Sequence, residues 1–216
     1  MRSSGTEPAP QNGEYTREIR EGLGPAVLAA GPPPVPVLAP PFSARVARPH
    51  GEDLDLVHRW MNLPHVAESY DQAWTRERWA DEIAGQLAGD YARPFIVELD
   101  GRPIAYVELY RAARDVLAGT YPARSHDVGF HIAIGETDSV GRGVGGRIFR
   151  AFIDGVFAAE PECTRLMSEP DFRNQAARRL DTKLGLRFLG EVDLPHKRAA
   201  LFVYPRAEAD VPNLSA

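Results

Sequence analysis

Hydrophobic residues follow two spacings that alternate along the chain. Apolar positions three or four residues apart, as on one face of a helix, occur over residues 53–61, 76–87, 144–156 and 174–184. Alternating or β-branched and aromatic runs, which are typical of strands, occupy residues 43–47, 94–99, 104–110, 128–134, 165–169, 188–192 and 200–204. This order predicts an α/β (α+β) domain with a mixed, mostly antiparallel central sheet flanked by helices.

Two short features refine this arrangement. Asp100-Gly101 joins two strand-like runs and is a dipeptide that tight hairpins prefer, so these two strands should pair directly. In the strand over residues 128–134, alternation places His131 on the face opposite to Phe130 and Ile132. Val128, Phe130, Ile132 and Ile134 should therefore share one face of the sheet, and Gly129, His131 and Ala133 the other.

The ends of the chain differ from its middle. Residues 1–31 are expected to be a flexible N-terminal segment, with a weak helix over residues 15–28. Prolines fix φ and remove backbone donors, so residues 32–42 should form an extended, proline-rich arm. The folded domain should cover residues 43–206, followed by a tail over 207–216. An arm that packs on the domain is favoured by its apolar residues Val35, Val37, Leu38 and Phe42.

Composition excludes several classes of function. The chain has 216 residues, 44% of them hydrophobic, and a formal net charge of −5. Such a chain has no global electrostatic reason to bind nucleic acid or an anionic membrane. No internal disulfide can form because Cys163 is the single cysteine, and no apolar run approaches the length of a membrane span. These features indicate a cytoplasmic protein, and the histidines show no spacing of metal ligands.

A glycine-rich turn over residues 141–146 precedes the long helix. Backbone N–H groups at a helix start attract anions, and glycines let the backbone approach a ligand closely. The turn is thus a candidate pyrophosphate cradle to which Arg142 and Arg147 would add positive charge. Close helix packing or a simple tight turn explains the same glycines. A Walker loop is excluded because no Gly-Lys-Ser/Thr sequence is present.

At these positions the chain resembles the GNAT (Gcn5-related N-acetyltransferase) family. The coenzyme A motif of that family matches at Gly141, Gly143 and Gly145, with Val140 at its usual Gln/Arg position. The later pattern of the family is similar to Asn174, Ala177, Leu180, Lys183 and Gly185. The resemblance implies a GNAT fold and acyl-CoA as co-substrate, acetyl-CoA or succinyl-CoA. It implies that acyl-CoA is bound by Ile132, Ala133, Ile134, Arg142, Gly143, Val144, Gly145, Gly146, Arg147 and Asn174.

The resemblance also marks one departure. Many GNAT enzymes carry a tyrosine that protonates the leaving thiolate, and Asp181 stands at the matching position. The tyrosine acid is therefore expected to be missing.

A narrower resemblance covers residues 32–205, including the proline-rich arm. The motifs are similar to those of the siderophore-biosynthesis branch, whose members acylate lysine or hydroxylated amines for mycobactin, aerobactin and desferrioxamine. They are Trp60-Met61-Asn62-Leu63-Pro64-His65, Trp74, Trp79, residues 106–110, Asp115, residues 127–131 and residues 169–174. The resemblance implies acylation of an amine or N-hydroxyamine in hydroxamate siderophore synthesis for iron acquisition, with a siderophore synthetase as partner.

Two residues are the candidate catalytic groups. His131 has an ordinary pKa suited to proton transfer near neutral pH, and the resemblance places it beside the thioester. The alternative is a histidine that only bonds within the sheet. Asp171 is expected to pair with His131, to orient it, or to hold a cationic substrate. Its alternative role is to cap the helix near Asn174.

Three further residues are candidate substrate contacts. Glu108 lies in a strand on the face of Tyr106 and Tyr110, where it would meet a substrate ammonium or stay partly exposed. Trp74 and Trp60 would line the aliphatic chain of an amine, although aromatic residues at helical spacing are more often core.

Two other functions remain open on the same fold. One is acetylation of an aminoglycoside or another polyamine. The other is a non-catalytic module that binds acyl-CoA, which the absence of the usual tyrosine at Asp181 would favour.

Overall fold

A computed structural model of the chain describes residues 17–70, 72–136 and 143–214. Seven strands form one sheet in the order β1-β2-β3-β4-β5-β7-β6. Every neighbouring pair is antiparallel except β4 and β5, which are parallel. The mixed, mostly antiparallel sheet is thus confirmed. The strands are β1 (Phe42–Val46), β2 (Ala92–Leu99), β3 (Arg102–Arg111), β4 (Val128–Ile134), β5 (Arg165–Ser168), β6 (Arg187–Leu194) and β7 (Lys197–Pro205).

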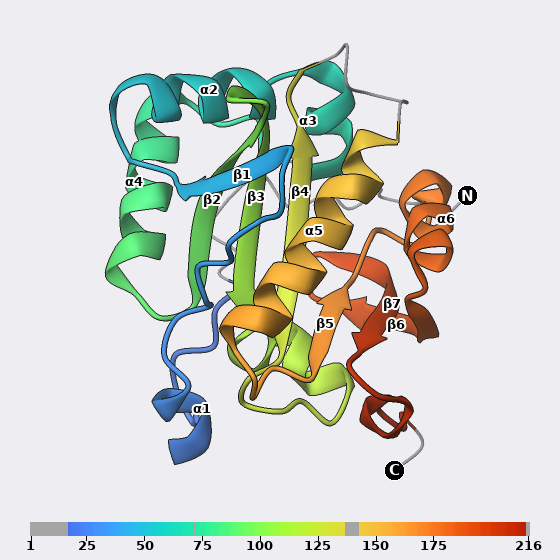
Figure 1. Cartoon of the computed structure of the whole chain (residues 1–216). Coiled ribbons are helices and arrows are strands. Elements are labelled where there is room, and N and C mark those ends of the chain that lie inside the picture. The colour runs from blue at the N-terminus through green and yellow to red at the C-terminus, as the bar shows by residue number, and fades with distance from the viewer. Residues whose placement is uncertain (1–16, 71, 137–142, 215–216) are drawn as a thin grey trace, which may run out of the picture.

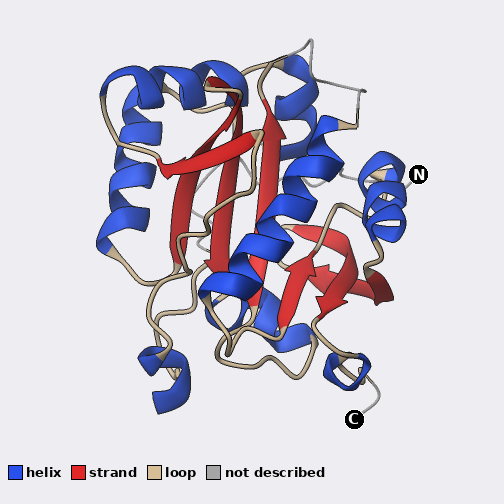
Figure 2. Cartoon of the chain, in the orientation of Figure 1, coloured by secondary structure: helices blue, strands red, loops and turns tan. Residues whose placement is uncertain are grey.

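Helices cover both faces of this sheet. The long helix α5 crosses one face, while α2, α3 and α4 gather at the other side of β2 to β4 (Figure 1; Figure 2 shows the strands in red). The helices are α1 (Pro25–Ala29), α2 (Gly51–Met61), α3 (Pro64–Tyr70), α4 (Arg76–Ala88), α5 (Val144–Ala159) and α6 (Gln175–Leu184). Short 3-10 turns cover Ala112–Arg114, Val116–Thr120 and Glu208–Asp210. No described helix is long and apolar enough to cross a membrane.

The two core layers follow the predicted alternation. Under α5, the core contains Phe130 from β4 and the helix residues Ile148 and Phe152. On the opposite face, Trp60 of α2 and Trp79 of α4 pack with Tyr106 of β3. Phe130 and Ala133 of β4 thus lie on opposite faces of the sheet, as the alternation predicts.

Local signals in the sequence account for several element ends. Thr75 caps α4 by accepting a hydrogen bond from the Arg78 N–H, and Asn174 caps α6 through the Ala177 N–H. Asp100 and Gly101 both have positive φ, as a tight hairpin between β2 and β3 requires.

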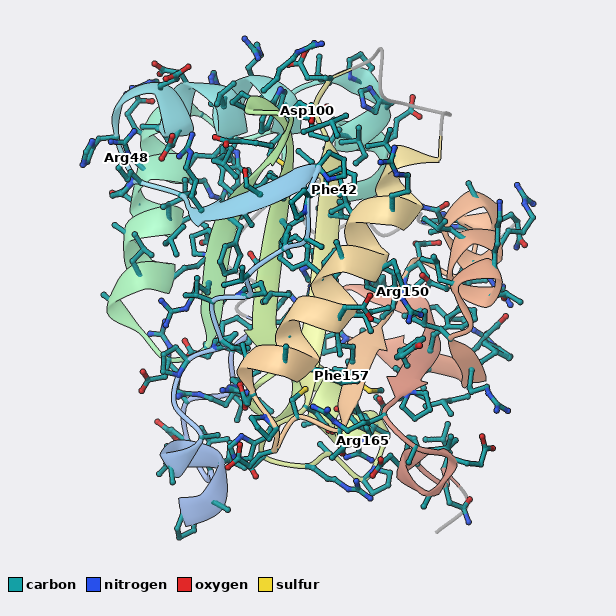
Figure 3. All side chains as sticks on the ribbon, in the orientation of Figure 1. Phe42, Arg48, Asp100, Arg150, Phe157 and Arg165 are labelled. Carbon is teal, nitrogen blue, oxygen red and sulfur yellow. The ribbon has the colours of Figure 1, made fainter. Side chains whose placement is uncertain are left out.

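The proline-rich arm packs along the domain. The carbonyl groups of Pro32, at its start, and of Ala30 and Gly31, just before it, accept hydrogen bonds from the guanidinium of Arg111, which is 1% exposed and also pairs with Glu160. A Cβ at Gly155 of α5 would stand 2.9 Å from Pro36, so this glycine permits the close contact. Among the apolar arm residues, Leu38 and Phe42 are buried, while Val35 and Val37 are exposed. Phe42 lies beside α5 (Figure 3), and the guanidinium of Arg147 stands 5.1 Å over its ring.

Two regions differ from the sequence expectation. From residue 17 onward, the N-terminal segment is tied to the domain through an isolated bridge between Glu18 and Asp115. The weak helix expected over residues 15–28 is limited, in the described part, to α1. Residues 64–70 form α3, which was not expected because Pro64 suggested only a turn; proline is compatible with the first turn of a helix.

Candidate active site

His131 of β4 stands at the centre of a cluster of charged side chains. Its Nδ1 atom lies 3.1 Å from Oε1 of Glu108, the residue directly opposite on β3. Its Nε2 atom lies 2.7 Å from Oε1 of Glu169, which follows β5. The imidazole is therefore held between two carboxylates, one on each side of the ring.

The two carboxylates favour the imidazolium form of His131. Burial and Arg17 lower the pKa of His131, but Glu169 and Glu108 outweigh them, so the pKa lies above its ordinary value. Although burial opposes it, His131, Lys197 and Arg17 hold the pKa of Glu169 well below its usual range. Glu169 is thus a fixed negative charge against the ring.

Tyr110 of β3 contacts both His131 and Glu169. Its ring stacks on His131 with centroids 4.8 Å apart, and its hydroxyl donates a hydrogen bond to Oε2 of Glu169 at 2.6 Å. Gly129 lies directly opposite Tyr110, and a Cβ there would come within 1.9 Å of the tyrosine ring. The glycine of the strand therefore leaves room for the ring that positions His131.

Arg17 enters the cluster from the N-terminal segment. Its Nη2 donates to Oε1 of Glu169 at 2.8 Å, and its Nε donates to Oδ2 of Asp115 at 3.0 Å. Its Nη1 lies 2.7 Å from Nε2 of His131. Tyr91 also donates to Asp115.

Among the described residues, no cluster of three or more His, Cys, Asp and Glu side chains is arranged to hold a metal ion.

Asp171 lies outside this cluster. Its carboxylate accepts three hydrogen bonds from Arg173, through the backbone N–H and the guanidinium, each at 2.9 Å. The expected pairing with His131 is made instead by Glu169, two residues earlier, because β5 aims that side chain at the imidazole ring. Asp171 does not cap α6 either, since the N-cap residue is Asn174.

Glu108 and the candidate tryptophans fall in different environments. Glu108 accepts a 2.6 Å hydrogen bond from Gln86 of α4 in addition to its contact with His131. Trp60 is fully buried, so the structure places it in the core rather than along an open chain-binding wall. Trp74 is partly buried, with the guanidinium of Arg78 stacked 4.0 Å over its ring.

The edge expected to receive acyl-CoA opens where β4 and β5 separate. The two strands pair only at Val128–Leu166 and Gly129–Met167, so the rest of β4 extends beyond β5. The Gly135 N–H donates to Ile104 of β3, and alternation then directs the N–H groups of Ile132 and Ile134 toward the open side. By the same alternation, the backbone N–H of Ala133 points toward β3 and not toward the open side.

Helix α3 contacts this open edge. The Ile132 N–H donates to the hydroxyl of Tyr70, and Nε2 of His65 lies 2.9 Å from the carbonyl oxygen of Ile134. Burial, with Glu108 and Glu169 adding to it, raises the pKa of Tyr70, so its phenol stays protonated. Two side chains of an unexpected helix thus meet the backbone that was expected to bind the thioester.

The glycine-rich turn ends at the start of α5. Gly143 is the N-cap residue of α5, which begins at Val144, and it adopts a left-handed conformation with φ of 74°. A Cβ at Gly145 would meet only Ile134 at 3.8 Å, whereas one at Gly146 would press on Leu180 of α6 at 3.0 Å. Gly146 therefore permits close helix packing, while Gly145 leaves open space. Arg142 lies outside the described residues.

Asp181 of α6 is buried beside the end of β5. Its Oδ2 accepts a hydrogen bond from the Ser168 hydroxyl at 2.9 Å. Burial raises the pKa of Asp181 to about 7, so this carboxyl keeps a proton over part of the neutral range. The position that lacks the usual tyrosine thus still holds a group able to donate a proton.

Sequence reasoning missed four members of the cluster. Tyr110, Asp115 and Glu169 stood within quoted motifs but received no role, and Arg17 lay in the segment expected to be flexible. One signal was available for Glu169: it is a charged residue at the end of the strand predicted over residues 165–169, two positions after Met167. Nothing local in the sequence connects Arg17 with His131, 114 residues away.

Comparisons with known proteins identify the family of the chain. Residues 50–194 match the family model described as acetyltransferase (GNAT) domain. The chain therefore belongs to the GNAT family of acetyltransferases. A solved structure of an uncharacterised protein from Bacillus halodurans has a TM-score of 0.73 and 26% identity, covering 80% of this chain and 90% of that one.

Named relatives narrow the class further. A protein named lysine N-acyltransferase MbtK from Mycobacterium sp. (strain MCS) is 42% identical over 186 residues, or 86% of this chain and 76% of that protein. One named N(6)-hydroxylysine O-acetyltransferase from Escherichia coli is 31% identical, covering 76% of this chain and 52% of that protein. The chain is thus an N-acyltransferase in the siderophore-biosynthesis branch of the GNAT family.

Proposed function

We propose that the protein transfers an acetyl or succinyl group from acyl-CoA to an N-hydroxylated diamine or N6-hydroxylysine, as a step in hydroxamate siderophore biosynthesis. The observation that carries this proposal is the position of His131, between Glu108 and Glu169 and next to the separation of β4 and β5. The names of the relatives, which refer to lysine and hydroxylysine, support the choice of acceptor.

The chemistry assigned to the site needs one base and one set of oxyanion donors. The substrate nitrogen attacks the thioester carbon, a C–N bond forms, and His131 takes the proton that the nitrogen loses. The Ile132 N–H would exchange the Tyr70 hydroxyl for the carbonyl oxygen on which negative charge develops. The C–S bond then breaks, and the thiolate takes a proton, for which Asp181 is the candidate donor.

An N-hydroxyamine suits this site because its oxygen lowers the basicity of the nitrogen. The nitrogen is then neutral more often than that of an alkylamine, and a histidine is a sufficient base. An ordinary lysine ammonium would have to lose its proton first, against the surrounding carboxylates Glu108 and Glu169, which favour cations.

The start of α5 is the proposed cradle for the pyrophosphate of coenzyme A. A helix of this length presents free N–H groups and the positive end of its dipole at Val144 to Gly146. Arg147 and Arg142 are proposed to add positive charge, and Asn174, the N-cap residue of α6, is proposed as a further contact to coenzyme A.

Gly145→Val should weaken acyl-CoA binding at least about tenfold with little loss of stability. The new Cβ meets only Ile134 at 3.8 Å in the protein itself, whereas its methyl groups would fill the space left for a phosphate. Calorimetric titration with acetyl-CoA measures the affinity, and thermal unfolding measures stability. Wild-type affinity in this variant would remove the phosphate cradle from the proposal.

The test of the proposed function is release of CoA thiol from acetyl-CoA and succinyl-CoA. Each is offered with N-hydroxycadaverine, N6-hydroxylysine, cadaverine, lysine or one aminoglycoside as the single acceptor. We expect release with the hydroxylated aliphatic amines. If only the aminoglycoside is acylated, the protein is an aminoglycoside acetyltransferase. If the protein binds acyl-CoA but acylates none of the amines, it is a non-catalytic acyl-CoA-binding module.

A further inference from the structure

The guanidinium of Arg17 is inserted among the charged and aromatic side chains around His131. It bridges Glu169 and Asp115, contacts Nε2 of His131, and stands 4.9 Å over the ring of Tyr110. These partners lie in β3 and β4, in the loop after β3, and directly after β5. Arg17 comes from the segment that precedes the first strand of the sheet.

In the described part of the chain, few backbone contacts hold the segment that carries Arg17. The Ile19 N–H donates to the Arg114 carbonyl, and the Val116 N–H donates to the Arg17 carbonyl. Glu18 adds an ion pair with Arg114 at 3.2 Å. The side chain of Arg17 is 20% exposed, so it lies at the mouth of the cluster rather than beneath it. It can leave without disturbing a strand.

Arg17 also blocks the base. Nε2 of His131 has a single hydrogen-bonding position, yet Nη1 of Arg17 and Oε1 of Glu169 both lie 2.7 Å from it. When His131 is neutral with Nε2 unprotonated, Arg17 donates to the lone pair that would accept a proton from the substrate; when His131 is an imidazolium, its Nε2–H donates to Glu169. In both forms Arg17 fills the space beside Nε2, so an attacking amine can approach this atom only after Arg17 has moved.

The negative charge around Arg17 restricts which ligands can replace its guanidinium. The carboxylates of Glu169 and Asp115 are both fully shielded from solvent, and Arg17 pairs with both. Without Arg17, Glu169 still faces His131 at 2.7 Å and Lys197 at 3.7 Å, but Asp115 keeps only the Tyr91 hydroxyl and the Leu117 N–H among its described side-chain contacts, and neither is charged. Leaving the buried carboxylate of Asp115 without a cation is costly, so the replacing ligand should itself be a cation.

We propose that Arg17 is a built-in occupant of the acceptor site, and that the substrate enters by displacing it and placing a cationic ammonium between Glu169 and Asp115. The acceptor class is then a diamine with one reacting nitrogen and a second, charged end. The identity of the site as an acceptor site rests on the proposed function above; the displacement of Arg17 is the new step.

The first experiment measures amine binding without turnover. Cadaverine is titrated calorimetrically into wild type and Arg17→Ala, with and without saturating coenzyme A. We expect at least about tenfold tighter binding in Arg17→Ala, because the ligand no longer competes with the guanidinium. Pentylamine, which lacks the second ammonium, should gain less. Arg20→Ala is the control, since Arg20 is exposed and pairs only with Glu18 among the bonds described. Unchanged or weaker cadaverine binding in Arg17→Ala would overturn the proposal.

A second measurement uses the wild-type protein and does not depend on how the variant folds. The Nε–H group of Arg17 donates to Asp115, so its NMR resonance should be shifted and slow to exchange with water. The resonance is assigned by its loss in Arg17→Lys. Saturating cadaverine should move it and speed its exchange. An unchanged resonance in the diamine-bound protein would show that Arg17 is a permanent wall of the site.

The two proposals fail in different ways. If Arg17→Ala binds cadaverine more tightly but no amine is acylated, the proposed cation site is supported and the proposed acyl transfer is wrong. If hydroxylated amines are acylated but Arg17 keeps its place when the diamine binds, the enzymatic proposal stands and the displacement is wrong.

Discussion

His131→Ala should lower kcat about 100-fold or more and leave acyl-CoA affinity within about twofold, because a positioned base contributes on the order of 10² to 10⁴ to such a step. The side chain faces Glu108, Glu169 and Tyr110, away from α5 and its glycine turn. Loss of the imidazole thus removes proton transfer but not the proposed phosphate contacts. Steady-state kinetics and calorimetric titration with acetyl-CoA measure the two effects separately.

The same site predicts a pH profile. His131 must be neutral to accept a proton, so kcat/KM should fall as the pH drops through its pKa. That pKa lies above the ordinary 6.5, with the two carboxylates outweighing burial and Arg17. Glu169→Gln removes one of these charges, so the acid limb should move to lower pH. If the acid limb of kcat/KM stays at the same pH in Glu169→Gln, a group other than His131 sets the pH profile.

His58→Ala is the matched control, because this histidine lies on α2, far along the chain from the cluster and in none of its contacts. It should keep wild-type kcat and the same pH profile. Wild-type turnover in His131→Ala would take the imidazole out of catalysis and leave positioning of the amine as the source of rate.

The fold could be predicted because its signals are local. Alternation in residues 128–134 reproduces β4 with the same bounds, and Asp100-Gly101 forms the expected hairpin. The bounds of other elements differ by a few residues, as at β3, which starts at Arg102 rather than residue 104. Helix α3 was missed because a seven-residue segment that begins with a proline carries too short a pattern to separate a helix from a turn.

The site was only partly predictable because its contacts join distant residues. His131 and Glu108 were named individually, but their pairing depends on the register of β3 and β4, which no single strand reveals. Choosing Asp171 over Glu169 depended on where β5 ends, and the sequence leaves that uncertain by a residue or two. The role of Arg17 required knowing how a segment outside the sheet returns to it.

Gly129→Ala should be among the most damaging single substitutions in the chain, although it adds one methyl group. Its Cβ would lie 1.9 Å from Cζ and 2.3 Å from Cε1 and Cε2 of Tyr110, a ring that is fully buried. The backbone of β4 is paired with β3 there, so the ring rather than the strand must move. Overpacking of this kind costs about 3 kcal/mol, which for a chain of this size lowers Tm by about 6–12 °C.

Activity should fall as well, and at temperatures where the variant is still folded. Tyr110 stacks on His131 and donates to Glu169, so a displaced ring removes the support of both groups. We expect kcat to drop about tenfold or more. Gly85→Ala is the control, since a Cβ there meets nothing within 4 Å; in the exposed interior of α4 it should stabilise the protein by about 1 kcal/mol.

A double variant separates the clash from the chemistry. Tyr110→Leu removes most of the ring, so Gly129→Ala should cost much less stability in that background than in the wild type, a coupling that a double-mutant cycle measures. The double variant should nevertheless remain poorly active, because leucine cannot donate the hydrogen bond that Tyr110 gives to Glu169. Recovery of stability without recovery of kcat would assign Gly129 to the positioning of the catalytic pair; full recovery of both would mean that Tyr110 only fills space.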